Sequence, residues 1–216
     1  PLLDGYGQTE ILMTVLNYPW MPVKPGSMGR PLPGIETGLL KVDGSLGGPG
    51  HQGELLIRLP SPQMMLGYWN DPERTEQALF RTDDSQWFRT GDNVYQDDDG
   101  YFFYVGRTDD IISSAGYRIG PQEVENALIR HPEVQESAVV GVPDLERGEI
   151  VKAFVVLADP GSESSRRDLV AELQNHVKQY TAPYKYPRSI EFVNELPKTV
   201  SGKIQRNLLR SREIPS

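Results

Sequence analysis

Residues 106–118 divide the sequence into two parts, because charged, apolar and glycine residues alternate there without the period of a helix or a strand. The segment follows an aromatic, strand-like run at Tyr101–Val105 and precedes a helical pattern that opens at Gly120-Pro121. It contains arginine, two adjacent carboxylates and glycine, and such residues on a connection between rigid elements more often bind or move than pack. We interpret the segment as a functional joint; the alternative is a solvated interdomain linker.

The first part, residues 1–109, is rich in glycine and proline and has short apolar runs between turns. Strands closed by tight turns are the natural prediction, at residues 36–42, 54–59 and 101–105. Asp71-Pro72 supplies a helix cap followed by a first-turn proline, so a short helix is expected to continue from there through Phe80.

The second part, residues 110–216, has longer periodic segments. A helix is expected from Pro121 to about His131, ending before Pro132 because the residue before a proline resists the helical region. Residues 134–142 and 149–157 predict an antiparallel hairpin, and residues 189–193 a third strand. Between them, a capping box at Ser165–Asp168 precedes a helix. The residues expected to be buried by the two helices are Val124, Ala127, Leu128, Leu169, Leu173 and Val177. The fold predicted for this part is a small α+β domain of βαβ-like order.

Composition excludes several classes of function. The formal net charge of −8 argues against general nucleic-acid binding, because no basic face offsets it. The absence of cysteine rules out disulfides, thiolate zinc sites and cysteine nucleophiles. No apolar run approaches the roughly 20 residues that cross a bilayer. Because Pro1 is not a start methionine and no basic leader follows it, we expect the chain to be a fragment of a longer protein.

Several short motifs do not predict a site when their context is considered. Residues 48–53 match a dinucleotide glycine pattern but lead into a strand, so a hairpin turn is the better interpretation. Ser201-Gly202-Lys203 lacks the first glycine and the hydroxyl of a phosphate-binding P-loop. Residues 97–100 lack the spaced ligands of a calcium loop. His51, His131 and His176 have no metal-ligand spacing, so surface or capping roles are expected for them.

Four separated stretches, taken together, resemble one family. They are Tyr6-Gly7-Gln8-Thr9-Glu10, Phe88-Arg89-Thr90-Gly91-Asp92, Gly106-Arg107-Thr108-Asp109 running to Gly116-Tyr117-Arg118, and Pro197-Lys198-Thr199-Val200-Ser201-Gly202-Lys203. In this order they are similar to the core motifs of the adenylate-forming acyl-CoA synthetases. Residues 117–121 and 182–188 look most like the medium-chain branch of that family.

The resemblance implies an α+β protein in which residues 1–109 are the end of a large N-terminal domain with a β-barrel-like subdomain. Residues 110–216 would be a small, mobile C-terminal lid domain, with the hinge at Asp109. The family's ATP phosphate loop and most of its acyl pocket would lie N-terminal to Pro1. The isolated chain is therefore not expected to catalyse the whole reaction.

Enzymes of this family join a carboxylate to ATP, release pyrophosphate, and then let the thiol of coenzyme A displace AMP from the acyl-adenylate. The resemblance places Gly5, Tyr6, Gly7, Gln8, Thr9 and Glu10 in the adenylate site, with the Tyr6 ring against adenine, the Thr9 hydroxyl at the α-phosphate and Glu10 on Mg²⁺. Asp92 and Arg107 would bind the ribose, since a carboxylate can accept from two adjacent hydroxyls. Lys203 would be catalytic, bridging the carboxylate and the α-phosphate. Without the resemblance, these residues would be interpreted as turn residues, surface ion-pair partners and an exposed loop lysine.

For the second half-reaction, the resemblance implies that the lid rotates and that Gly116 borders the tunnel for the pantetheine arm, where a side chain would obstruct the thiol. Ala115 and Tyr117 flank it, and Arg118 would approach the phosphate or acyl end of the substrate. Coenzyme A phosphates call for cations, and the candidates are Arg147, Lys178 and Arg188 together with Tyr186.

The expected partners are small molecules: a fatty or other carboxylic acid, ATP and coenzyme A. Two other interpretations stay open, an adenylation domain that loads a carrier protein and a noncatalytic nucleotide-binding fragment. Bacterial cytoplasm and mitochondrial matrix both fit the sequence, which sets neither the acyl length nor the oligomeric state.

Overall fold

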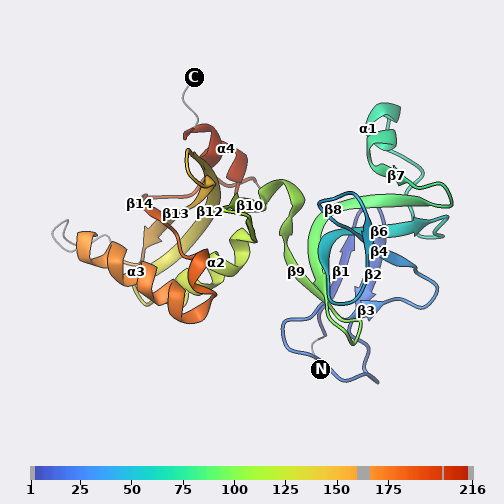
Figure 1. Ribbon diagram of the computed structural model, residues 1–216, viewed down its shortest axis with the longest axis horizontal. Helices are drawn as coiled ribbons and strands as arrows, with labels where there is room; N and C mark the ends of the chain where they lie inside the picture. The colour runs from blue at the N-terminus through green and yellow to red at the C-terminus, as the bar shows by residue number, and fades with distance from the viewer. Residues whose placement is uncertain (1–2, 160–165, 201, 214–216) are drawn as a thin grey trace. The chain divides into compact units, whose positions relative to one another are not determined.

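The structure is a computed structural model that describes residues 3–159, 166–200 and 202–213. The chain forms two compact units, residues 1–108 and 109–216, each with its own apolar core (Figure 1). The boundary lies one residue before the expected one, within the short 3₁₀ helix η1 (Thr108–Asp110).

The first unit consists of two antiparallel sheets. The smaller one has the order β1-β2-β3, and the larger one has the order β5-β4-β6-β8-β7, with β9 also paired to β8. These strands are β1 (Gly5–Gln8), β2 (Leu12–Leu16), β3 (Arg30–Pro31), β4 (Thr37–Leu40), β5 (Leu46–Gly47), β6 (Gln52–Leu59), β7 (Leu79–Arg81), β8 (Gln86–Gln96) and β9 (Phe102–Arg107). Both sheets contribute to one core, which includes Tyr6 and Val15 from the first and Ile57 and Phe88 from the second. The predicted α+β class is confirmed; among the described strands no pairing joins β5 to β7, so the larger sheet stays open.

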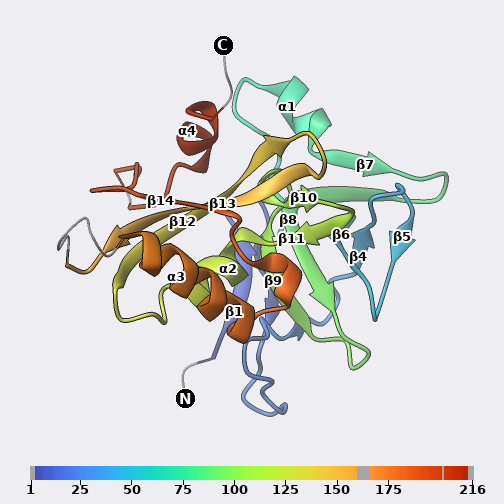
Figure 2. The same ribbon diagram turned by 60° about the vertical axis from the view of Figure 1, so that its left-hand side comes forward.

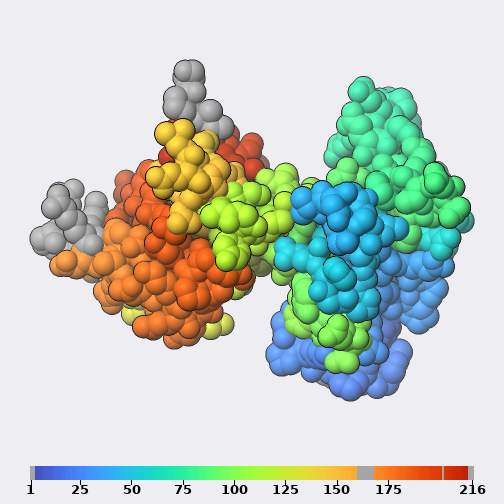
Figure 3. Space-filling view, viewed as in Figure 1, coloured from blue at the N-terminus to red at the C-terminus, as the bar shows by residue number. Residues whose placement is uncertain are grey.

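The three strands predicted in this unit correspond to β4, β6 and β9. Helix α1 (Pro72–Gln77) begins as predicted, because the Asp71 side chain accepts from the backbone N–H of Arg74 at 3.0 Å. The prediction that it continues through Phe80 is wrong, since Leu79–Arg81 forms β7 against β8. Figure 3 shows this α1–β7 segment projecting from the first unit. Residues 48–51 turn from β5 to β6 as expected, but these two strands pair with β4 and not with each other.

The second unit is built on one mixed sheet of order β11-β10-β13-β12, with β14 beside β13. The strands are β10 (Ile112–Ser114), β11 (Tyr117–Ile119), β12 (Val134–Asp144), β13 (Gly148–Leu157) and β14 (Ser189–Phe192). The predicted antiparallel hairpin is confirmed, with β12 and β13 in register from Val134↔Leu157 to Asp144↔Gly148. β14 runs parallel to β13 after a helical crossover, which confirms the βαβ-like order.

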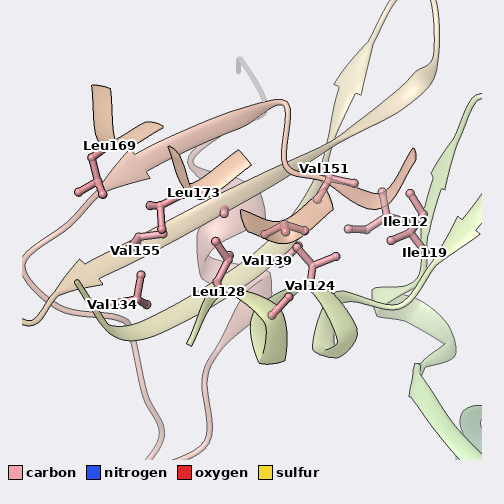
Figure 4. Close-up of a cluster of buried hydrophobic side chains, with 13 residues drawn as sticks. Ile112, Ile119, Val124, Leu128, Val134, Val139, Val151, Val155, Leu169 and Leu173 are labelled. Carbon is pink, nitrogen blue, oxygen red and sulfur yellow. The ribbon is translucent and has the colours of Figure 1, made fainter. Parts of the chain in front are cut away.

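Helices cover both faces of this sheet (Figures 1 and 2). α2 (Pro121–Leu128) and α3 (Arg166–Tyr180) pack on one face, where all the predicted helix positions are buried (Figure 4). α4 (Arg206–Ser211), which the sequence did not predict, packs Leu209 on the other face. Because β12 alternates, Val139 faces the first pair of helices while Ala138 and Val140 face α4, so a strand buried on both sides appears as a continuous apolar run.

The end of α2 differs from the prediction, and the predicted cap of α3 lies partly outside the described residues. α2 ends at Leu128, three residues before the expected end, and residues 129–131 continue in turns. Ser165 of the capping box lies outside the described residues. In the described parts of the chain, no helix has the length and apolar character that a membrane span requires.

Candidate functional site

Asp92 is the point at which three separated motifs meet in the first unit. The Tyr6 hydroxyl donates to Asp92 Oδ2 at 2.7 Å, and Gln8 Nε2 donates to the same oxygen at 2.5 Å and to the Thr90 carbonyl at 2.8 Å. On the other oxygen, the Tyr104 hydroxyl donates at 3.3 Å and Arg107 Nη1 at 3.5 Å. Both carboxylate oxygens are therefore oriented by protein donors, with two donors on each oxygen.

The backbone of β8 explains why Asp92 lies there. The first part of β8 pairs with β7 and the last part with β9, so residues 89–91 lie where one partner strand replaces the other. Thr90 Oγ1 donates to the Leu55 carbonyl and accepts from the Asp92 N–H, which fixes the bend. Gly91 has a φ of +70°, and a Cβ there would lie 2.6 Å from Arg107 Nη2. Glycine is thus required at this position for the conformation and for the approach of Arg107.

The two charged residues of this site, Asp92 and Arg107, differ in how much of each side chain is exposed to solvent. The Asp92 side chain is 7% exposed, whereas that of Arg107 is 48% exposed. Arg107 also donates to the Thr90 carbonyl at 3.2 Å, so its guanidinium is held beside the carboxylate while part of it faces solvent. Burial and the Asp92 charge raise the pKa of the Tyr6 hydroxyl, which keeps it a proton donor. Asp92 and Arg107 together therefore place a carboxylate acceptor and a guanidinium donor side by side, where one polar ligand could contact both.

In the β1–β2 hairpin, the Tyr6 ring packs in the core and 8% of the residue is exposed. Its place against adenine stays a prediction. Gly7 is needed for the hairpin itself, because a Cβ there would overlap the Leu12 carbonyl. Likewise, a Cβ on Gly5 would overlap the side chains of Leu16 and Met13. The backbone of β2 therefore already accounts for glycine at position 7, whereas the side chains beside Gly5 could shift.

Thr9 and Glu10 lie in the turn after β1. The Glu10 carboxylate accepts from the Tyr68 hydroxyl at 3.0 Å through Oε1, and its second oxygen has no hydrogen-bond partner among the described residues. A single carboxylate suits Mg²⁺, which is commonly bound by one or two carboxylates with water and substrate phosphates. In the described parts of the chain no group of three or more His, Cys, Asp or Glu residues is arranged for a metal.

In the second unit, Lys203 lies on an exposed loop that is closed by backbone hydrogen bonds. Thr199 N–H donates to the Lys203 carbonyl at 2.8 Å, and Gln205 N–H donates to the Pro197 carbonyl at 2.9 Å. The Lys203 N–H donates to Thr199 Oγ1 at 3.1 Å. Its ammonium makes no hydrogen bond or ion pair to any residue that the structure describes. The loop therefore presents an exposed cation between backbone hydrogen bonds that join residues 197 and 199 to residues 205 and 203.

The expected coenzyme A residues form two groups. Ala115 and Gly116, with φ of +49° and +82°, make the two-residue turn between β10 and β11. The Ala115 N–H donates to the Arg147 carbonyl at 2.9 Å, so this turn lies beside the tip of the β12–β13 hairpin. A Cβ on Gly116 would meet nothing within 4 Å, which agrees with an open approach to this position.

Lys178, Tyr186 and Arg188 form the second group. Lys178 Nζ lies 4.2 Å and Arg188 Cζ 4.9 Å from the centroid of the Tyr186 ring. Arg188 Nη1 also donates to the Tyr186 hydroxyl at 2.9 Å. Two cations thus share one aromatic ring, an arrangement suited to phosphate.

Sequence reasoning missed several neighbours of these residues. Tyr184 stacks on Tyr117 with ring centroids 4.1 Å apart, and no local sequence pattern indicated this contact. Arg118 Nε is buried without a hydrogen-bond partner among the described residues.

The carbonyl of Asp109, the expected hinge residue, accepts from Arg210 at 2.8 Å. His131 and His176 lie ring to ring, 5.0 Å apart, and the buried His131 accepts the Glu133 N–H as a cap.

Comparisons with known proteins agree with the motifs. The family model described as AMP-binding enzyme matches residues 1–69, and the one described as AMP-binding enzyme C-terminal domain matches residues 123–203. The mitochondrial acyl-coenzyme A synthetase ACSM4 of Mus musculus is 51% identical over 98% of this chain and 36% of its own length. The uncharacterized acyl-CoA ligase YtcI of Bacillus subtilis is 51% identical over 97% of this chain and 39% of its own length. The chain spans little more than a third of these relatives.

Solved structures of CoA ligases are also similar to this chain. The anthranilate CoA ligase AuaEII in complex with anthranoyl-AMP has a TM-score of 0.81 and 41% identity, covering 98% of this chain and 39% of that one. The o-succinylbenzoate CoA synthetase MenE of Bacillus subtilis in complex with its acyl-adenylate OSB-AMP has a TM-score of 0.82 and 33% identity, covering 97% and 41%.

Proposed function

The chain belongs to the AMP-binding enzyme family, and on this premise we propose that it supplies the ribose-binding strands and the C-terminal domain of an ATP-dependent acyl-CoA synthetase. In the first half-reaction a carboxylate oxygen attacks the α-phosphorus of ATP and pyrophosphate leaves. In the second, the sulfur of coenzyme A attacks the acyl carbon, AMP leaves with the bonding electrons, and the thiol proton is released.

The observation that carries the proposal is the convergence of Tyr6, Gln8 and Arg107 on the carboxylate of Asp92. Asp92 accepts from the two ribose hydroxyls and Arg107 donates to the same sugar. Tyr6, the most buried of these donors, and Gln8 orient Oδ2, which limits the movement of the carboxylate before the nucleotide binds. Gly5 and Gly7 of β1 and Thr9 of the turn after it lie beside this carboxylate, and Glu10 would hold Mg²⁺, which would screen the phosphate charge.

Lys203 acts in the first half-reaction, where its ammonium stabilises the negative charge that builds up as carboxylate and phosphate approach. Its exposure and its lack of a carboxylate partner among the described residues leave the charge available for substrate. Arg118 approaches the phosphate or acyl end of the substrate. The second unit takes up a different orientation for each half-reaction, with Asp109 as the hinge.

Coenzyme A binds in the second half-reaction. Ala115, Gly116 and Tyr117 border the pantetheine arm, and the open space at Gly116 supports this role. Lys178, Tyr186 and Arg188 bind the nucleotide of coenzyme A, and Arg147 contributes a further cation next to the β10–β11 turn.

The acid is a medium-chain fatty acid, because the relatives at about half identity include acyl-coenzyme A synthetases of the ACSM type and residues 117–121 and 182–188 resemble that branch. The compartment is the bacterial cytoplasm or the mitochondrial matrix, since relatives come from Bacillus subtilis and from mitochondria.

The test is exchange of radiolabelled pyrophosphate into ATP by the full-length enzyme, with straight-chain fatty acids of increasing length. Exchange that depends on the acid and is greatest for a medium chain, followed by thioester formation on addition of coenzyme A, is the expected result. Nucleotide binding without exchange would show a noncatalytic protein, and exchange without thioester would show a different acceptor.

A further inference from the structure

An ion-pair cluster in the second unit links α4, which follows the Lys203 loop, to residues 109–110. Arg206, the first residue of α4, makes a double contact with Glu125 of α2, with Nη2 at 2.8 Å from Oε2 and 2.9 Å from Oε1. Arg206 Nη1 also lies 3.6 Å from Asp110 Oδ2. The side chains of Glu125 and Asp110 are each 12% exposed, so these charges are mostly removed from water.

Arg210, one turn further along α4, completes the cluster. It forms an ion pair with the Asp110 carboxylate and donates through Nη1 to the Asp109 carbonyl at 2.8 Å. Two arginines on one face of a six-residue helix therefore contact three oxygens of residues 109–110 and both carboxylate oxygens of Glu125.

Glu125 extends the connection into the sheet. Its Oε1 accepts the backbone N–H of Val139 at 2.8 Å, in the middle of β12. Burial raises the pKa of its carboxyl, while the Arg206 guanidinium and the Val139 N–H act in the opposite direction. Without Arg206, the Glu125 carboxylate would stay buried with one backbone N–H as its donor. A buried charge without its partner is unfavourable, so the residues around Glu125 would have to rearrange.

Helix α4 depends on tertiary contacts for its stability. Six residues cannot form a stable helix in water, because the first turn costs more than one hydrogen bond returns. α4 has no side-chain N-cap, and its apolar anchor in the core is Leu209. Lys203 precedes α4 by only three residues, and the Gln205 N–H ties the end of its loop to Pro197.

We propose that Arg206 and Arg210 are positioning residues that fix the Lys203 loop to residues 109–110 and so set the place of the lysine during adenylation. The proposal rests on the proposed function, because it assigns the cluster a role in that reaction. Lys203 acts only in the first half-reaction, whereas the β10–β11 turn that borders coenzyme A is tied to the tip of the β12–β13 hairpin, through the Ala115 N–H and the Arg147 carbonyl. Loss of the cluster should therefore separate the two half-reactions.

The experiment compares Arg206→Gln and Arg210→Gln with Leu173→Ala in the full-length enzyme. Leu173 is fully buried between α3 and the sheet, so its truncation destabilises the same unit without touching the cluster. Pyrophosphate exchange with octanoate and thioester formation from supplied octanoyl-adenylate are measured separately. Displacement of a reacting group by about 1 Å can cost on the order of 100-fold. We expect kcat for exchange to fall about 10- to 100-fold in both arginine variants, with an unchanged KM for ATP and thioester formation within about twofold of wild type.

Two further readouts separate positioning from general destabilisation. Amide hydrogen exchange of residues 202–205 should be faster in Arg206→Gln than in wild type and unchanged in Leu173→Ala. The double variant Arg206→Gln/Glu125→Gln should lose no more exchange activity than Arg206→Gln alone, because both members of one pair are removed.

An equal loss of both half-reactions in the arginine variants and in Leu173→Ala, or unchanged hydrogen exchange of the loop, would overturn the proposal. If Arg206→Gln does not fold, Arg210→Gln carries the test, since Arg210 is more exposed at 31%. A wild-type enzyme without any pyrophosphate exchange would overturn the proposed function instead. The hydrogen exchange of residues 202–205 would then still decide whether the arginines hold the loop.

Discussion

Asp92 is buried and receives donors from two strands, β1 and β9, and its contributions to folding and to ligand binding can be measured in separate experiments. Tyr6 is the most buried of these donors, with 8% of the residue exposed. A buried hydrogen bond to a charged acceptor contributes more than a neutral one, and leaving the acceptor short of a donor is costly.

We predict that Tyr6→Phe lowers the free energy of unfolding of the first unit by about 1–3 kcal/mol, because Asp92 loses a buried donor. Urea unfolding followed by tryptophan fluorescence measures this directly, since Trp20, Trp69 and Trp87 are all the tryptophans of the sequence and lie in residues 1–108.

The matched control is Tyr104→Phe. Its hydroxyl donates to the same carboxylate, but at 3.3 Å and from a residue that is 38% exposed. We expect a change of less than about 0.5 kcal/mol there, as for surface substitutions in general. Equal effects of the two substitutions would show that burial of the Tyr6 hydroxyl has no special role.

At the level of elements, α2 and α3 meet through two histidines. His176 Nε2 lies 3.1 Å from the Ala127 carbonyl, and His131 Nε2 lies 3.2 Å from Glu172 Oε1. Burial, followed by the neighbouring His131, lowers the pKa of His176. Below the ordinary histidine pKa of about 6.5, the unfolded chain thus binds a proton at His176 that the folded unit still excludes.

We predict that the second unit loses stability as the pH falls from 7.5 to 5.5, and that His176→Gln makes this loss smaller. The sign follows because the unfolded state binds more protons in that window, so stability rises with pH. Hydrogen exchange of α2 and α3 at the two pH values measures it. His51→Gln, at an exposed turn of the first unit, is the control and should leave the pH dependence as in wild type. A His176→Gln protein with the wild-type slope would contradict the prediction.

Long periodic elements were predictable from sequence, and short or mutually dependent ones were not. The β12–β13 hairpin and the buried stripes of α2 and α3 follow from repeated apolar positions that local patterns capture. β8 was missed because Arg89 to Asp92 interrupts its apolar alternation, and β7 was then mistaken for helix since its partner was unknown. α4 is too short to show a period, and it depends on contacts with distant residues.

The residues of the candidate site could be identified from motifs, but their contacts could not. Tyr6 and Asp92 are 86 positions apart, and only tertiary structure brings the hydroxyl to the carboxylate. Gly5 and Gly7 were assigned to nucleotide approach, and only tertiary structure reveals that the backbone of Leu12 and Met13 also excludes a Cβ at Gly7. Tyr184 and the arginines of α4 have no local pattern that distinguishes them from other surface residues.

At the scale of the whole molecule, the chain consists of two units with separate cores and separate candidate residues. Asp92 and Arg107 belong to the first unit, and Lys203 and the cations around Tyr186 belong to the second. Because the chain spans little more than a third of the length of these relatives, the proposed roles are those of one part of a larger enzyme. Among these roles, the one on which the others depend is that Lys203 serves only one of the two half-reactions.

The most direct test is Lys203→Ala in the full-length enzyme, with the two half-reactions measured separately. Removing a charge that stabilises the transition state costs on the order of 100- to 1,000-fold, so pyrophosphate exchange should fall by that factor. Thioester formation from supplied acyl-adenylate should stay within about threefold of wild type. Lys198→Ala is the matched control, because Lys198 lies on the same loop but pairs with Glu136 at 2.6 Å, and it should retain both activities. Equal loss of both half-reactions in Lys203→Ala would contradict the account.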